Sequence, residues 1–255
     1  MRSFLLLALT FCLWRPTASS QAPADTYKFF DAAWKPVKEK KAVYLLRISF
    51  TKDSCWKYCY YNVFGPLVRI ETYQDQQATI RQGLFAWYDE DGAVDSSGYY
   101  YQGLPDREWI YWKHDRKALH YDKGKLLDDK ELEAQRKTEE IIDRNWAKVE
   151  RLTAESYFPG GDAGWLQYLN DNLHYPKRAI DHFVRGTVVL WFEVAPTGKL
   201  KELQIKQSIE LSIDDEALRM AQNSPDWIPA IRFDRRLRSY KAQPIVFRLE
   251  VSNGR

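Results

Sequence analysis

The chain has little of what several functional classes require. Its 255 residues include three cysteines and four histidines, with no His-Glu-x-x-His spacing and no second cysteine pair to complete a metal site. The Gly-rich loop at residues 160–164 lacks the Lys-Ser/Thr of a phosphate cradle, and no Gly-x-Ser-x-Gly nucleophile elbow occurs. We therefore expect no enzyme, no metal and no cofactor.

A long apolar run is also missing. Residues 4–14 are mostly apolar, but a helix that spans a bilayer needs ~20 such residues. Arg2 precedes this run and Ala18-Ser19-Ser20 follows it, as is typical of a secretory signal. We expect residues 1–20 to be a signal peptide whose cleavage leaves Gln21 first. A short, uncleaved anchor is the alternative.

Charge of one sign and clustered proline are absent as well. Loss of residues 1–20 would remove Arg2 and Arg15 and lower the formal net charge from +3 to +1. A nearly neutral chain gives no electrostatic reason to expect a nucleic-acid partner, and no motif indicates a small-molecule substrate. The remaining prolines are scattered, so no stiff Pro-rich spacer is predicted. We expect a periplasmic protein, or one peripherally associated with the envelope.

Two cysteines, Cys55 and Cys59, would remain after export. In a straight strand four residues span ~13 Å, which is beyond the ~7 Å limit for the Cα atoms of a disulfide. A bridge therefore requires a turn at residues 56–58. An oxidising periplasm favours the bridge if such a turn exists, and two free thiols are the alternative.

Aromatic residues are abundant, with ten Trp and sixteen Tyr. The pattern Phe85-x-Trp87-Tyr88 recurs as Trp109-x-Tyr111-Trp112, and Asp-Gly and Gln-Gly pairs provide hairpin turns between the copies. Residues 42–50 add a leading strand. We expect an antiparallel β-rich domain over residues 21–126. Residues 60–126 resemble MORN-type repeats, and that resemblance implies a non-catalytic scaffold; a sheet needed only for folding is the alternative.

A charged segment follows at residues 127–155. It has good helix formers and no Gly or Pro, and Ile142, Trp146 and Val149 recur at helical spacing. We interpret it as a helical linker with a boundary near Ser156. Because the apolar patterns on either side are separate, we expect the two halves to fold independently.

The last 100 residues, 156–255, have the pattern of a small α+β domain. Val188, Leu190, Phe192 and Val194 alternate along a strand, and a Pro-Thr-Gly turn at 196–198 leads to a second strand. Ser212 is a candidate N-cap for a helix, since Asp215 follows three residues later. Alternation returns at residues 243–251. The expected order is strand, strand, helix, strand.

This segment resembles the TonB C-terminal domain, a periplasmic module that contacts outer-membrane transporters. The resemblance is carried by Tyr175-Pro176, the Gly before the first strand, the Gly turn and Trp227-Ile228-Pro229. In that family a transporter peptide pairs with the exposed edge of the last strand. The resemblance implies partner-binding residues at His174, Tyr175, Pro176, Gln243, Ile245, Val246, Phe247, Arg248 and Leu249.

The resemblance leaves three functions open. The first is an exported binding protein that engages an outer-membrane TonB-dependent transporter or another envelope protein. A divergent energy transducer that couples proton-motive force to transmembrane transport is the second, although it would need an anchor and a long spacer. The third is a non-catalytic periplasmic scaffold.

Overall fold

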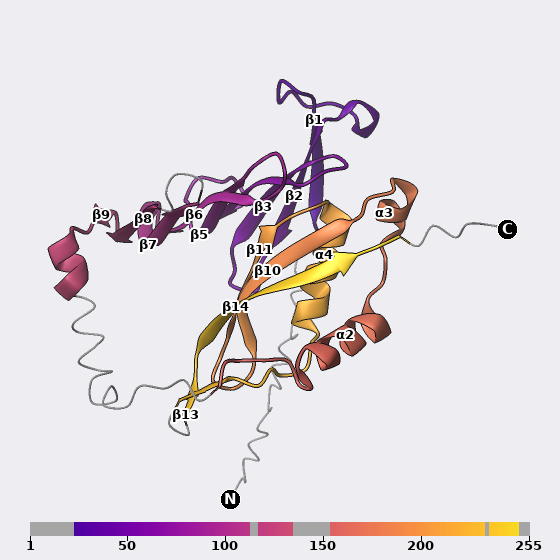
Figure 1. Cartoon of the computed structure of the whole chain (residues 1–255). Helices are drawn as coiled ribbons and strands as arrows, with labels where there is room; N and C mark the ends of the chain where they lie inside the picture. The colour runs from indigo at the N-terminus through magenta and orange to yellow at the C-terminus, as the bar shows by residue number, and fades with distance from the viewer. Residues whose placement is uncertain (1–22, 113–116, 135–153, 233–234, 250–255) are drawn as a thin grey trace, which may run out of the picture.

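The computed structural model describes residues 23–112, 117–134, 154–232 and 235–249 (Figure 1). The expected signal peptide and most of the expected linker lie outside these residues. Residues 129–134 are helical and form the described start of the predicted connecting helix. None of the described helices is long and apolar enough to cross a membrane.

The N-terminal half forms one antiparallel sheet whose nine strands follow each other in sequence order. A short 3₁₀ helix, η1 (Glu39–Lys41), precedes the second strand. The strands of this sheet are β1 (Thr26–Phe30), β2 (Tyr44–Phe50), β3 (Trp56–Asn62), β4 (Leu67–Tyr73), β5 (Gly83–Tyr88), β6 (Val94–Tyr101), β7 (Leu104–Tyr111), β8 (Lys117–Asp122) and β9 (Lys125–Leu126). The predicted antiparallel sheet is confirmed; its likeness to MORN repeats stays a prediction.

The aromatic repeat produces a ladder of rings on one face of this sheet. Tyr73 contacts Phe85 with ring centroids 5.5 Å apart, Phe85 contacts Tyr100 at 4.7 Å, and Tyr100 contacts Trp109 at 5.2 Å. Trp109 lies over Gly98, where an added Cβ would stand 2.1 Å from the indole. The equivalent positions of the two copies, Phe85 and Trp109, therefore belong to one packed row.

The C-terminal half is the α+β domain that the sequence predicts. A three-stranded sheet has the order β11-β10-β14, and a separate hairpin joins β12 to β13. The buried face of β10 packs against helix α4. The elements are α2 (Gly161–Asn172), α3 (Lys177–Asp181), β10 (Gly186–Val194), β11 (Leu200–Gln207), α4 (Leu211–Gln222), β12 (Ala230–Arg232), β13 (Arg235–Leu237) and β14 (Ser239–Phe247).

Two predicted boundaries are wrong. Helix α4 is capped by Glu210 and not by Ser212, because the Glu210 carboxylate accepts the Ser212 amide at 2.8 Å. The last strand spans Ser239–Phe247 and not 243–251, because the chain already pairs with β10 from Ser239 onward. Arg248 and Leu249 follow the strand, and residues 250–251 lie outside the described part.

The two halves share one apolar core, and the independent folding of each half stays a prediction. Buried residues of β2–β5 and of the C-terminal domain form a single apolar cluster. The Asp-Gly turn between β5 and β6 meets the end of β11, where Ser208 N donates to Gly92 O at 2.8 Å. Tyr88 Oη also donates to Ile205 O at 2.8 Å. The division into two units at these boundaries remains a proposal about chain organisation.

Cys55 and Cys59 are both free thiols. Residues 56–58, where a disulfide would need a turn, are the straight beginning of β3. Cys59 is buried in the shared core, whereas Cys55 is half-buried before the strand. Of the two alternatives left by the sequence, the structure holds the free thiols, since the extended backbone separates them.

Candidate functional site

The free edge of β14 is the candidate partner-binding edge. β14 is the outer strand of the three-stranded sheet, and within the described residues no other strand pairs with its far side (Figure 1). β11, at the opposite end of the sheet, is held to the N-terminal sheet by a bridge between Ala93 and Gln207. Strand β14 therefore offers the more open edge for a further strand.

The pairing register gives the direction of the β14 backbone groups. Pro244 lies opposite Val189 of β10. Antiparallel partners alternate between pairs that exchange both hydrogen bonds and pairs that exchange none. Pro244 has no N–H, so this pair is of the second kind, and the backbone carbonyl of Pro244 faces the free edge.

The same alternation assigns the neighbouring predicted residues. Gln243 and Ile245 bond to β10 through their backbones, whereas Ala242 and Val246 direct their amides to the free edge. Side chains alternate in step: Ile245 and Phe247 are buried, and Val246 is 47% exposed. The edge amides thus lie beside exposed side chains, where a partner strand has access.

The predicted Tyr-Pro pair reaches the end of this strand. Tyr175 Oη donates to Val184 O at 2.5 Å, and its ring stands nearly perpendicular to that of Phe247 at 5.8 Å. Pro176 is the N-cap residue of α3, with φ −65°. The structure therefore brings Tyr175 and Phe247 together, although 72 positions separate them in the chain.

His174 is placed by helix α4. Its backbone amide donates to Glu216 Oε1 at 2.7 Å, while its side chain is 81% exposed. Burial alone would raise the pKa of Glu216, but hydrogen bonds from Arg219 and from the His174 amide lower it. Arg219 also lies 3.1 Å from His174 Nδ1. Glu216 therefore anchors the backbone and leaves the imidazole facing solvent.

The remaining predicted residues lie at the end of the edge. Arg248 is exposed and Leu249 is half-buried, and both follow the last residue of β14. They are outside the regular ladder, so their backbones are not part of the paired strand. Side-chain contact with a partner is what they can contribute.

A buried charge network at the junction of the two halves has no counterpart in the predicted site. Asp214 at the start of α4 is fully buried, and its carboxylate accepts from Ser208 Oγ at 2.5 Å and from Ile209 N at 3.1 Å. Burial raises its pKa to about 7 despite these bonds. Arg47 of β2 contacts the neighbouring Asp215 at 2.5 Å. Nothing in the sequence indicates this network, because Arg47 and Asp214 each look like an ordinary surface residue.

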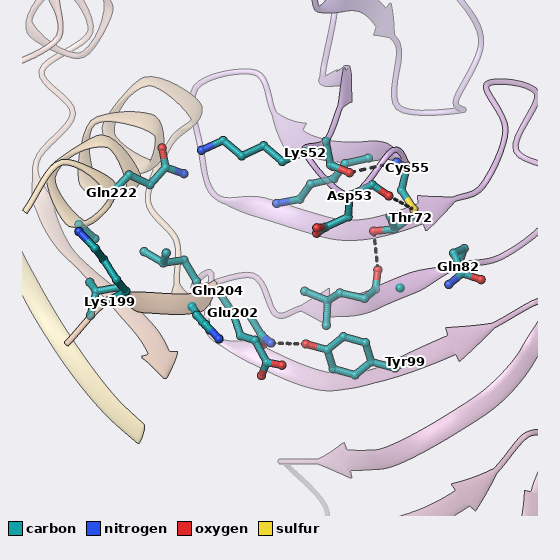
Figure 2. Close-up of a pocket in the computed structure, with 18 of the residues that line it drawn as sticks. Lys52, Asp53, Cys55, Thr72, Gln82, Tyr99, Lys199, Glu202, Gln204 and Gln222 are labelled. Carbon is teal, nitrogen blue, oxygen red and sulfur yellow. Dashed lines mark hydrogen bonds between the residues drawn. The ribbon is translucent and has the colours of Figure 1, made fainter. Parts of the chain in front are cut away.

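A groove of about 1090 Å³ lies between the N-terminal sheet and the β11–α4 side of the C-terminal domain (Figure 2). Lys52 and Gln222 line it from opposite halves of the chain. Gln204 Nε2 donates to Tyr99 Oη at 2.7 Å on its floor, and nearby Lys199 pairs with Asp226 at 2.7 Å. Throughout the described part of the chain, no group of three or more His, Cys, Asp or Glu is arranged to hold a metal ion. The lining also includes the free thiol of Cys55 and charged side chains from both halves of the chain.

The comparison with protein families covers the C-terminal domain. The model for the C-terminal of the Gram-negative bacterial TonB protein matches residues 171–249, which contain both the Tyr-Pro pair and β14. No curated protein and no solved structure matches the chain significantly. TonB C-terminal domains are non-enzymatic interaction domains of the cell envelope. Residues 171–249 are therefore similar to the C-terminal domain of the TonB protein.

Proposed function

We propose that this chain is an exported envelope protein whose C-terminal domain binds a partner by β-strand addition to β14. The partner would be an outer-membrane TonB-dependent transporter or another envelope protein that presents an extended segment. The observation that carries this proposal is the free edge of β14, with Ala242 and Val246 amides directed outward. Strand addition takes its affinity from such backbone bonds.

His174, Tyr175 and Pro176 support the same site from one side. Tyr175 packs on Phe247, so the loop that carries His174 is fixed beside the end of β14. A strand that pairs with Val246 would continue toward this loop and meet the exposed imidazole. We propose that the loop contributes side-chain contacts, while β14 contributes the backbone ladder.

The N-terminal sheet favours a scaffold as the second candidate function. Its shared core with the C-terminal domain fixes the two halves as one body around the Gly92–Ser208 contact. A large aromatic sheet held in this way could organise a complex without any transporter. Energy transduction would require a membrane anchor, and residues 1–22 lie outside the described part.

Two variants test strand addition directly. Val246→Pro removes one amide from the free edge, and because that amide does not bond to β10, the sheet should persist. Arg248→Ala keeps the backbone and is the matched control. Titration of the folded full chain with N-terminal peptides of outer-membrane transporters should show about tenfold weaker binding for Val246→Pro and only a mild loss for Arg248→Ala, which removes a side-chain contact and no backbone donor. Equal affinities in both variants, with native circular dichroism spectra, would remove β14 as the site.

A further inference from the structure

Pro244 stands at the middle of the free edge of β14. Its side chain is exposed, so the core does not require it. Because Pro244 lies opposite Val189 in a pair that exchanges no hydrogen bonds, its backbone nitrogen faces the free edge, where another residue would offer an N–H donor. A strand that adds to β14 therefore finds donors on either side, at Ala242 and Val246, and none between them.

The rest of the edge has the features of a strand that would pair with itself. Between the exposed Arg238 and Arg248, the four residues whose side chains share the exposed face are uncharged: Tyr240, Ala242, Pro244 and Val246. Tyr240 and Val246 are each 47% exposed. Natural sheets protect such an edge with charge, bulges or proline. Of these devices, only proline is present on that face of the strand.

We propose that Pro244 keeps β14 from pairing with the β14 edge of a second copy and so reserves the edge for a strand of different sequence. In a two-fold antiparallel pair of β14 strands, each copy brings one Pro244, and two carbonyl groups lack a donor. A different strand meets a single Pro244 and loses a single bond. Pro244 thereby favours a heterologous partner over self-association, which deepens the proposed function.

Sedimentation velocity of the full chain over a wide concentration range tests this inference. Wild type should remain monomeric. Pro244→Ala, and Pro244→Val as a second variant in case one folds poorly, should self-associate about tenfold or more tightly. The matched control is the double variant Pro244→Ala with Val246→Pro, which moves the missing donor to the next edge-facing position and should return the chain to a monomer.

Two results would overturn the inference. One is a wild-type chain that already dimerises with slow amide exchange at Ala242 and Val246. The other is a folded Pro244→Ala and Pro244→Val pair that both stay monomeric at every concentration. No transporter peptide enters this experiment, so failure of the proposed function, read from the peptide titration, stays distinguishable from failure of the role of Pro244.

Discussion

Asp214 connects the two halves at the scale of a single residue. Ser208 Oγ accepts the Leu67 amide at 2.8 Å and donates to the Asp214 carboxylate, so one hydrogen-bond chain runs from β4 to the start of α4. The side chain is completely buried, and Tyr61 and Asp215 are among the titratable groups beside it. Burial favours the neutral acid, and the negative charge of Asp215 acts in the same direction.

The raised pKa of Asp214 makes stability depend on pH. The folded chain holds this proton up to about pH 7, whereas the unfolded chain releases it near pH 4. Folding therefore binds a proton in this window, and the free energy of unfolding should fall as the pH rises through it. Urea unfolding of wild type and Asp214→Asn at pH 5 and pH 7 should show a wild-type loss on the order of 2 kcal/mol that the variant lacks. Parallel pH profiles for the two proteins would contradict the assignment.

Elements with a strong alternating pattern were predictable, and those defined by a distant partner were not. The alternating apolar residues of β10 predict that strand. The first residues of β14, by contrast, include half-buried polar side chains such as Lys241, and they form a strand because β10 pairs with them. Strand β1 is mostly exposed and depends in the same way on β2. Local pattern cannot reveal an element whose stability comes from pairing.

The turn between β5 and β6 offers a test at the scale of elements. Gly92 has φ +81°, and a Cβ there would stand 2.3 Å from Ser208 O, so Gly92→Ala should both strain the turn and separate the two halves. Gly103 has a similar φ of +84°, but a Cβ added there would have no atom within 4 Å, so Gly103→Ala should show the backbone strain alone. In thermal unfolding, the midpoint temperature of Gly92→Ala should lie clearly below that of Gly103→Ala. The stability of Gly103→Ala should itself fall by about 1 kcal/mol relative to wild type. Equal losses would show that the Gly92 contact does not hold the junction.

At the scale of the whole molecule, the sequence predicted the two sheets but not their union. The contacts that join them link residues far apart, as Leu67 with Ser208 and Arg47 with Asp215. Such pairs carry no periodicity, and each half taken alone has a plausible apolar pattern of its own. The order of elements in the C-terminal domain followed from its alternating pattern, whereas the proposed partner-binding edge followed from a family resemblance, which the match over residues 171–249 supports.

Amide hydrogen exchange of the full chain, with and without an N-terminal transporter peptide that binds it, tests strand addition most directly. Gln243 and Ile245 should exchange slowly in both states because their amides already bond to β10. Ala242 and Val246 should exchange quickly in the free chain and become protected when the peptide is bound. Protection that appears only around the groove, at residues 199–204, with no change in β14, would contradict the account.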